Sequence, residues 1–346
     1  MKPFLSAIIP CRNEARFLGR CLDSVLANDY PHDRMEVLAI DGGSTDGTRQ
    51  LIAEYQKRDA RVRLIDNPQG ITPWALNHGI NAARGEIIAR VDAHAGIGAN
   101  YLSGCVENLL ASGADNVGGT MHTLPQDPGL FAGPIVAALS HRFGVGNSHF
   151  RVGSKEPRWV DTVFGGCWRR DVFERVGLFN TALKRSQDME FSRRLKAAGG
   201  RTLLVPGIAS DYYARSRMAE FWRHNLSNGE WAVLPFIYSP VMPVSLRHLI
   251  PLVFVAALAT GISLAPWSVW PLAAVAIPYA IANLAASVQV AWRERRPHYA
   301  LLMPIVFFVL HLGYGLGSLQ GLGKVAAIWR TSRTARIEEN PCLPQS

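Results

Sequence analysis

Two long stretches without a charged residue constrain the fold of this chain more than any other feature of its sequence. Residues 249–292 contain no Asp, Glu, Lys or Arg over 44 positions, and residues 297–323 contain none over 27. A helix needs about 20 apolar residues to cross a bilayer, so the first stretch has room for two spans and the second for one. Runs of this length are rare in soluble cores. We therefore expect membrane segments at residues 249–265, 268–292 and 300–321.

The residues around these segments predict an orientation. No signal peptide is expected, because Lys2 alone precedes an apolar run, residues 5–9, that is too short to be one. Arg293, Arg295 and Arg296 lie between the second and third segments, and such residues face the cytoplasm by the positive-inside rule. The sequence thus predicts an inner (cytoplasmic) membrane protein whose N-terminal domain is cytoplasmic.

The third segment carries a conflict. Three spans would place the C-terminal tail outside, whereas the basic residues after the last segment favour the inside; these are Lys324, Arg330, Arg333 and Arg336. Glycines also make this segment a poor simple helix; they are Gly313, Gly315, Gly317, Gly321 and Gly323. A re-entrant segment, or one that lies against its neighbours, is the alternative to a span.

The net charge of +9, from 36 basic and 27 acidic residues, favours contact with nucleic acid or with an anionic membrane. The basic residues cluster around the apolar segments and form no aromatic–basic platform, so we expect a membrane partner and no nucleic acid. The five cysteines are widely spaced and lack a C-x-x-C pattern, which is typical of free thiols in a reducing compartment.

The first 92 residues alternate between strand and helix patterns. The predicted strands are residues 6–10, 36–40, 61–66 and 86–91. Helical periodicity fills the intervals between them. This alternation predicts an open α/β fold, a mostly parallel sheet with flanking helices, and ligands bind such sheets at the carboxyl ends of the strands.

Polar residues follow each of these strands. They are Arg12, Asn13 and Glu14 after the first strand, residues 41–46 after the second, Asp66 and Asn67 after the third, and Asp92 and His94 after the fourth. One Asp at a strand end is often only a helix cap or turn former. Several carboxylates on one edge repel each other unless a cation or hydrogen-bond donors lie among them, so we expect a ligand site at this edge.

The strongest local signal is the turn Asp-Gly-Gly-Ser-Thr-Asp-Gly at residues 41–47. Its glycines allow close approach of a ligand, and Ser44, Thr45 or Asp46 can cap the next helix. A plain β–α turn is the alternative. Because the turn lacks G-x-G-x-x-G and a P-loop lysine, it predicts neither dinucleotide nor P-loop chemistry; a buried Asp41 would instead accept hydrogen bonds from a base or a ribose.

Asp92 and His94 place a carboxylate and an imidazole two residues apart, directly after an internal strand. In an extended chain both side chains lie on one side. They could therefore share a divalent cation with a diphosphate.

Together these motifs resemble the inverting glycosyltransferases of family 2, which have the GT-A fold, and more narrowly the membrane-anchored, succinoglycan-type enzymes of exopolysaccharide assembly. The segments that carry the resemblance are residues 8–14, 41–48, 67–70, 77–79, 83–86, 92–94, 144–148, 161–163 and 187–191. Leu76 stands where the family often has Arg, and His224 where relatives often have Gln. The Q-x-x-R-W signature of processive synthases is absent, which favours addition of a single sugar.

The resemblance implies a role for individual residues. Asp188 would be the catalytic general base, early in a helix predicted at residues 185–198; its alternative role is charge complementarity with the helix N-terminus. Asp92 and His94 would bind Mg²⁺ or Mn²⁺. The implied nucleotide-sugar-binding residues are Pro10, Arg12, Asn13, Glu14, Asp41, Ser44, Asp46, Asn67 and Asp92. The implied acceptor residues are Gly165, Gly166, Cys167, Glu190 and His224.

The implied reaction is the inverting, metal-dependent transfer of one sugar from a UDP-sugar, with UDP-glucose as a candidate, to a polyprenyl-diphosphate-linked saccharide in exopolysaccharide assembly. A polyprenyl-phosphate sugar synthase and a nucleotide-sugar-binding membrane scaffold without turnover remain as alternatives. Other polysaccharide-assembly proteins are candidate partners. The expected domains are a GT-A domain at residues 1–214, an interfacial amphipathic segment at 215–247, a transmembrane region at 248–323 and a basic tail at 324–346.

Overall fold

The computed structural model describes residues 2–239 and 245–338, without the side chains of residue 246 and residues 331–338. Residues 240–244 of the expected interfacial segment and residues 339–346 of the expected tail, Cys342 among them, lie outside the described residues. The chain divides into two compact units, Met1–Ser216 and Arg217–Ser346.

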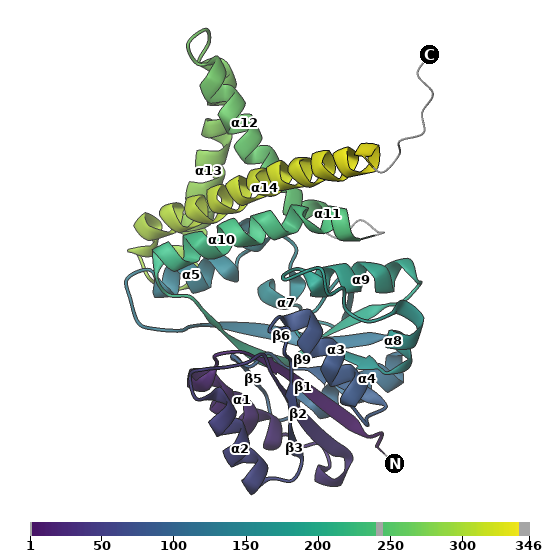
Figure 1. The fold of residues 1–346 in the computed structure, drawn as a ribbon. Coiled ribbons are helices and arrows are strands. Elements are labelled where there is room, and N and C mark those ends of the chain that lie inside the picture. The colour runs from purple at the N-terminus through teal and green to yellow at the C-terminus, as the bar shows by residue number, and fades with distance from the viewer. Residues whose placement is uncertain (1, 240–244, 339–346) are drawn as a thin grey trace. The chain divides into compact units, whose positions relative to one another are not determined.

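The first unit is built on a nine-stranded mixed sheet in the order β3-β2-β1-β4-β8-β6-β9-β5, with β7 paired to β9 (Figure 1). The strands are β1 (Leu5–Cys11), β2 (Met35–Asp41), β3 (Val62–Asp66), β4 (Ile87–Arg90), β5 (Ala95–Ile97), β6 (Asn116–Pro125), β7 (Arg158–Val160), β8 (Cys167–Arg169) and β9 (Thr202–Ala214). The first four strands are parallel, whereas β8 pairs antiparallel with both β4 and β6. The predicted α/β fold is confirmed.

Helices cover both faces of this sheet. They are α1 (Ala15–Leu26), α2 (Thr48–Arg58), α3 (Thr72–Ala82), α4 (Tyr101–Ser112), α5 (Ala132–Leu139), α6 (Arg142–Val145), α7 (His149–Val152), α8 (Asp171–Val176) and α9 (Gln187–Ala197), with a 3₁₀ turn, η1, at His32–Arg34. Apolar side chains of α1, α2 and α4 form one core with the sheet, and those of α3, α8 and α9 form the other. Successive strand residues alternate between the two cores, as Ile8 and Ile9 do, because side chains of a strand point to opposite faces.

The second unit consists of helices. They are α10 (Met218–Val233), α11 (Pro235–Tyr238), the 3₁₀ turn η2 (Leu246–Leu249), α12 (Ile250–Leu264), α13 (Trp270–Arg293) and α14 (Tyr299–Glu338). Three helical stretches are long and apolar enough to cross a membrane, namely Arg247–Leu264, Trp270–Arg293 and Tyr299–Arg330. They lie where the sequence analysis expects membrane segments.

The expectation that glycines make the third segment a poor simple helix is wrong. α14 is one continuous helix of 40 residues, and its glycines are points of close packing with other helices. A Cβ at Gly317 would collide with the backbone carbonyl of Leu226, and one at Gly321 would lie 2.8 Å from the carbonyl oxygen of Glu230. The glycines therefore let the backbones of α10 and α14 approach each other, as small residues do between membrane helices.

A substitution at this contact tests its contribution to stability. We expect Gly317→Leu to separate α10 from α14 and to destabilise the protein by about 1–3 kcal/mol, the usual cost of overpacking. Gly323→Leu is the matched control, because nothing lies within 4 Å of a Cβ at Gly323 on the same helix. Thermal unfolding of the detergent-solubilised chain gives the comparison. Equal melting temperatures for the two variants would contradict the packing described here.

Candidate active site

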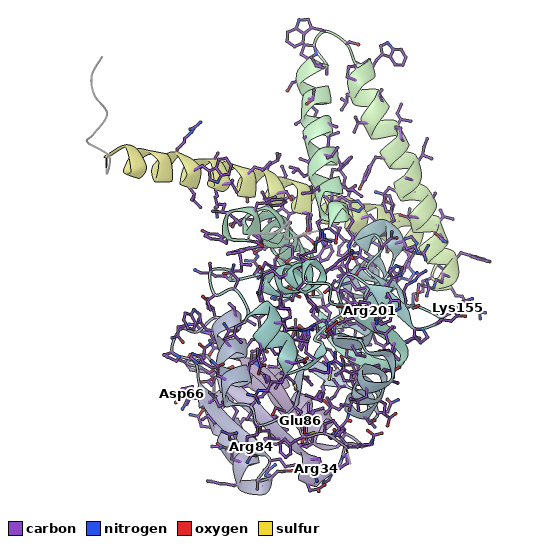
Figure 2. All side chains as sticks on the ribbon, turned by 90° about the vertical axis from the view of Figure 1, so that its right-hand side faces the viewer. Arg34, Asp66, Arg84, Glu86, Lys155 and Arg201 are labelled. Carbon is purple, nitrogen blue, oxygen red and sulfur yellow. The ribbon has the colours of Figure 1, made fainter. Side chains whose placement is uncertain are left out.

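The carboxyl ends of four parallel strands form one edge of the sheet. Cys11 of β1 is in register with Asp41 of β2, and Asp41 is in register with Asp66 of β3. Figure 2 labels residues at both ends of these strands. Arg34, Arg84 and Glu86 lie just before a strand begins, and Asp66 is the residue at which β3 ends. The polar residues that the sequence analysis assigns to strand ends therefore gather at one edge, as expected.

The loops after β1 and β2 are bound to each other. The backbone N–H of Asn13 donates to Ser44 Oγ (2.8 Å), and Asn13 Oδ1 accepts from the N–H of Thr45 (2.9 Å). The N–H of Glu14 donates to Thr48 Oγ1 (2.8 Å). Asn13 adopts a left-handed conformation, with φ of 56°, which Asn tolerates better than most residues. Asn13 and Ser44 thus shape the loops through contacts that their positions in the sequence do not reveal.

Asp41 is turned onto its own loop rather than toward open space. Its side chain is fully buried, and its carboxylate accepts from the N–H groups of Gly43 and Ser44 (3.2 Å each) and from Arg49 Nη1 (3.0 Å). Burial raises the pKa of Asp41, but the hydrogen bonds and the Arg49 charge outweigh burial and lower the pKa overall. In this arrangement Asp41 holds the loop through Oδ2.

Two further predicted residues also make loop contacts. Asp46 accepts from Thr48 Oγ1 (2.6 Å) and from the N–H groups of Thr48 and Ala15 (3.1 Å each), so it joins the starts of α1 and α2. Arg12 Nη1 donates to the carbonyl oxygen of Gly70 (2.9 Å). These bonds connect the loop after β3 to the loops after β1 and β2.

Asn67 differs from these residues because one of its polar atoms has no hydrogen-bond partner in the described chain. Its N–H donates to the Asp41 carbonyl (2.8 Å) and its Nδ2 to the Ile71 carbonyl (3.1 Å). Asn67 Oδ1 is buried and has no partner among the described residues. A buried acceptor without a donor is costly, so a ligand N–H or O–H would be stabilised here. Pro10 lies in β1 beside Ile40, one residue before the edge.

Asp92 and His94 follow β4 at the same edge. His94 Nδ1 lies 3.4 Å from Glu14 Oε1, so the loop after β1 reaches the Asp92 segment. Burial lowers the pKa of His94, but Glu14 and Asp92 outweigh burial and raise the pKa overall. For Asp92, burial is outweighed by Arg90 and His94, and its pKa is lowered. Glu14 therefore lies beside the pair Asp92 and His94, a contact that the sequence analysis did not predict.

Arg90, the last residue of β4, is a site residue that the sequence analysis missed. Its side chain is 9% exposed, and its Nε donates to Asp92 Oδ1 at 2.8 Å. Burial lowers the pKa of Arg90, but the charges of Asp92 and Asp188 outweigh burial and raise it overall. Arg90 Nη1 is buried and has no partner in the described part of the chain. A charged residue inside an otherwise apolar strand was the signal that could have identified it.

Asp188 lies in the first turn of α9, and its Oδ1 accepts from the N–H of Met189 (2.9 Å). The charge of Asp188 acts on Arg151 of α7, a second site residue that the sequence analysis did not identify. Burial lowers the pKa of Arg151, and Tyr212 and Asp188 only partly offset this. The Arg151 guanidinium stands over the Tyr212 ring at 5.2 Å, and its Nη1 is buried without a partner among the residues described.

Tyr212 of β9 connects the Asp188 side of the site to the Asp92 side. Its ring makes edge contacts with the rings of His94 and Phe164, each at 5.9 Å between centroids. Asp92, His94, Arg90 and Asp188 therefore belong to one cluster in the first unit. The sequence offered no signal for Tyr212, because its contacts come from three separate chain segments.

The structure corrects part of the expected acceptor set. Cys167 lies in the sheet interior at 0% exposure, and Glu190, also at 0%, is paired with Arg194 (2.7 Å). Neither faces an acceptor. Gly165 and Gly166 pack on the backbone of Arg90, where the Gly166 carbonyl accepts from the Arg90 N–H (2.9 Å). His224 lies on α10, which belongs to the second unit.

The donor atoms fit a divalent cation that arrives with its substrate. Among the described residues no three His, Cys, Asp or Glu side chains are grouped to hold a metal. Asp92 Oδ1 accepts a hydrogen bond from Arg90, so Oδ2 is the oxygen of this carboxylate that could bind a cation. Mg²⁺ commonly binds through one or two protein ligands, substrate phosphates and water. Asp92 with His94 matches that pattern and not a preformed metal cage.

Comparison with known proteins identifies relatives. Residues 6–177 match the family described as glycosyl transferase family 2. The chain is 30% identical over 313 residues to the succinoglycan biosynthesis protein ExoA of Rhizobium meliloti, covering 90% of this chain and 92% of that protein. It is 26% identical to a dolichyl N-acetyl-α-D-glucosaminyl phosphate 3-β-D-2,3-diacetamido-2,3-dideoxy-β-D-glucuronosyltransferase of Methanococcus voltae, covering 93% and 98%.

A solved structure shares the fold. The mannosyltransferase PcManGT from Pyrobaculum calidifontis, solved with GDP-Man and Mn²⁺, aligns with a TM-score of 0.58 and 20% identity. The alignment covers 91% of this chain and 87% of that one.

The Asp41 contacts predict a pH-dependent effect on stability. Because the folded-state pKa of Asp41 is lowered, its contribution is present above the pKa of an unfolded Asp, about 3.9, and is lost as pH falls through the lowered value. We expect Asp41→Asn to cost about 1–3 kcal/mol at pH 7 and less at a pH below the lowered pKa of Asp41. Asp66→Asn is the control, because Asp66 binds the same Arg49 but is 73% exposed. Thermal unfolding of the variants at both pH values measures this difference. An equal loss of stability in Asp41→Asn at both pH values would show that the ionised Asp41 carboxylate does not stabilise the loop.

Proposed function

We propose a specific reaction for this chain, which belongs to glycosyl transferase family 2 and is a glycosyltransferase. The reaction is the inverting transfer of one sugar from a UDP-sugar, with UDP-glucose as first candidate, to a saccharide on polyprenyl diphosphate in exopolysaccharide assembly. The observation that carries the proposal is the cluster of Asp92, His94, Arg90 and Asp188 beside the strand-end loops.

The acceptor proposal rests on the membrane helices and on the relatives. The chain is membrane-associated through its C-terminal apolar helices, and a lipid-linked acceptor has to be met at a membrane. One relative is named for succinoglycan biosynthesis, and the name of another contains a dolichyl-linked sugar phosphate. We place this activity at the inner membrane, with residues 2–216 in the cytoplasm where nucleotide sugars are made.

The donor proposal rests on the loops at the sheet edge. Asn67 Oδ1 offers a buried acceptor without a partner in the described chain, and a base N–H or a ribose hydroxyl would supply the missing donor. Arg12, Asn13, Glu14, Ser44 and Asp46 fix the loops around it. The structural neighbour is named with GDP-Man, so GDP-mannose belongs in any donor screen beside the UDP-sugars.

Asp92 and His94 would hold the divalent cation, Mg²⁺ or Mn²⁺, which supplies positive charge to the departing diphosphate when bound. The structural neighbour is named with Mn²⁺. Arg90 keeps the Asp92 carboxylate ionised and oriented. The unpaired Nη1 atoms of Arg90 and Arg151, as the structure describes them, are suited to donate to anionic oxygens in the same cluster.

Asp188 would act as the general base. The acceptor hydroxyl oxygen attacks the anomeric carbon, its proton passes to the Asp188 carboxylate, and the bond from carbon to the diphosphate oxygen breaks to release the nucleoside diphosphate. Attack opposite to the leaving group inverts the anomeric configuration. The charge of Asp188 acts on Arg90 and on Arg151, the two buried arginines of the cluster.

The role of Asp188 predicts a loss of turnover with retained donor binding. The purified chain is assayed with labelled UDP-glucose, UDP-galactose, UDP-N-acetylglucosamine and GDP-mannose, and a lipid-linked saccharide. We expect Asp188→Asn to lower kcat by about 10²–10⁴-fold, the usual contribution of a general base, with little change in KM for the donor. Glu174→Gln, an exposed acidic residue at the start of α8, is the control and should keep full activity.

Two results would redirect the assignment. A near-normal rate in Asp188→Asn, with polyprenyl phosphate as acceptor, would favour a polyprenyl-phosphate sugar synthase, because that acceptor oxygen is already anionic and needs no base. Donor binding without any product would favour a nucleotide-sugar-binding scaffold.

The metal proposal makes a separate prediction. We expect EDTA to abolish transfer and Mn²⁺ or Mg²⁺ to restore it. Because the protein supplies few ligands, Mn²⁺ should bind weakly alone and at least about tenfold more tightly with UDP present, as measured by calorimetry. Asp92→Asn should remove this enhancement, whereas Asp66→Asn at the same edge should keep it. Full activity of the chelated, metal-free protein would refute the proposed ligands.

A further inference from the structure

The packing of α14 within the second unit points to its place in the membrane. We propose that α10 and α14 lie together along the membrane surface, that α14 is not a third membrane span, and that only the hairpin of α12 and α13 enters the bilayer. The chain then ends on the same side of the membrane as residues 2–216. This inference goes beyond the proposed reaction and does not depend on it.

The first support is that α14 runs across the hairpin and not along it. Phe254 of α12 stacks on Tyr279 of α13 with ring centroids 4.3 Å apart, so these two residues mark one level of the hairpin. At this level α14 contacts α13, where Tyr279 Oη lies 3.1 Å from His311 Nδ1. One turn later Gly315 of α14 packs on Val255 of α12. Asn283, one turn from Tyr279 on α13, donates through Nδ2 to the Pro304 carbonyl of α14 (3.0 Å), so α14 passes from one arm to the other within about one turn of the hairpin.

The figures agree with these contacts. In both views α14 lies crosswise to the α12–α13 hairpin (Figures 1 and 2). At 1.5 Å per residue, the 40 residues of α14 are about 60 Å long, roughly twice the hydrocarbon thickness. If the hairpin stands in the bilayer, a helix crosswise to it lies near the membrane plane.

The second support is the polar helix that packs against α14. α10 lies alongside α14, where Leu226 meets Gly317, and Lys324 Nζ pairs with Glu230 Oε1 at 2.6 Å. α10 also carries Arg223, which is exposed. If α14 spanned the bilayer, Arg223 and Glu230 would be carried into hydrocarbon, where each charge costs roughly 2.5–3.5 kcal/mol. At the surface these charges stay in contact with water and headgroups.

The third support is the distribution of charge on the hairpin. Its open end carries Arg247 before α12, Arg293 as the last residue of α13, and Arg295 and Arg296 after it. Its closed tip, residues 265–269, carries no charge. Basic residues at the open end fit the cytoplasmic face. With α14 at the surface, Lys324 and Arg330 also lie on this face, so the conflict between three spans and a basic tail disappears.

The partner that fits this surface is an anionic lipid bilayer. Exposed apolar side chains of α14, Leu319, Leu322 and Trp329, accompany the basic Lys324, which is 58% exposed. Apolar residues beside basic ones are typical of helices that lie in the interface, with the apolar part among the acyl chains and the charge at the headgroups.

The side of the C-terminus tests the proposal. Cys342 is a natural reporter, since the other four cysteines are buried. We expect a membrane-impermeant maleimide to label Cys342 in inverted vesicles and not in sealed right-side-out vesicles. Lys155→Cys in a Cys342→Ser background reports the side of the first unit, because Lys155 is exposed (Figure 2). Labelling after detergent permeabilisation shows that each thiol is reactive.

Labelling of Cys342 and of Lys155→Cys from the same face supports the proposal. Labelling of the two from opposite faces would show an odd number of crossings and would overturn it. Neither result bears on catalysis, because transfer activity in detergent is measured separately and does not depend on the side of the tail.

Discussion

The ion pair between Arg90 and Asp92 is the interaction on which the arrangement of the site depends. Both side chains are largely shielded from water, with 9% and 15% exposed, and a buried charge is tolerated only when it is paired. β4 places the pair near the loop after β1, whose Glu14 lies 3.4 Å from His94. The pair keeps a carboxylate ionised next to its neighbours Glu14 and His94, and it sets a cation beside Asp188.

A second constraint acts on the C-terminal unit. The backbones of two helices can approach closely only where the side chains between them are small. The glycines of α14 serve this purpose where α10 lies against it, since side chains at Gly317 and Gly321 would meet the α10 backbone. The same contacts bring polar residues of α10 beside an apolar helix. Composition alone does not reveal that combination.

The strands and helices of the first 92 residues follow from local patterns, because periodicity and turn residues act over short distances. The strand-end residues gather as expected, since parallel strands end at a common edge. The hydrogen-bond partners of these residues, however, could not be predicted from local patterns. Asp41 was expected to face a nucleotide, but Ser44 and Arg49 occupy its carboxylate. Arg151 and Tyr212 were not identified, because their neighbours come from segments distant in sequence.

The sequence by itself determined an α/β domain followed by apolar membrane helices, and it determined which chemical groups stand at the strand ends. Only the tertiary structure decided which of those groups already form hydrogen bonds or ion pairs within the chain. It buried Cys167 and Glu190, which the sequence analysis assigned to the acceptor set, and it paired Arg90 with Asp92. The physical reason is that periodicity is a local property of the chain. Burial and hydrogen-bond partners depend instead on contacts between segments that are far apart in the sequence.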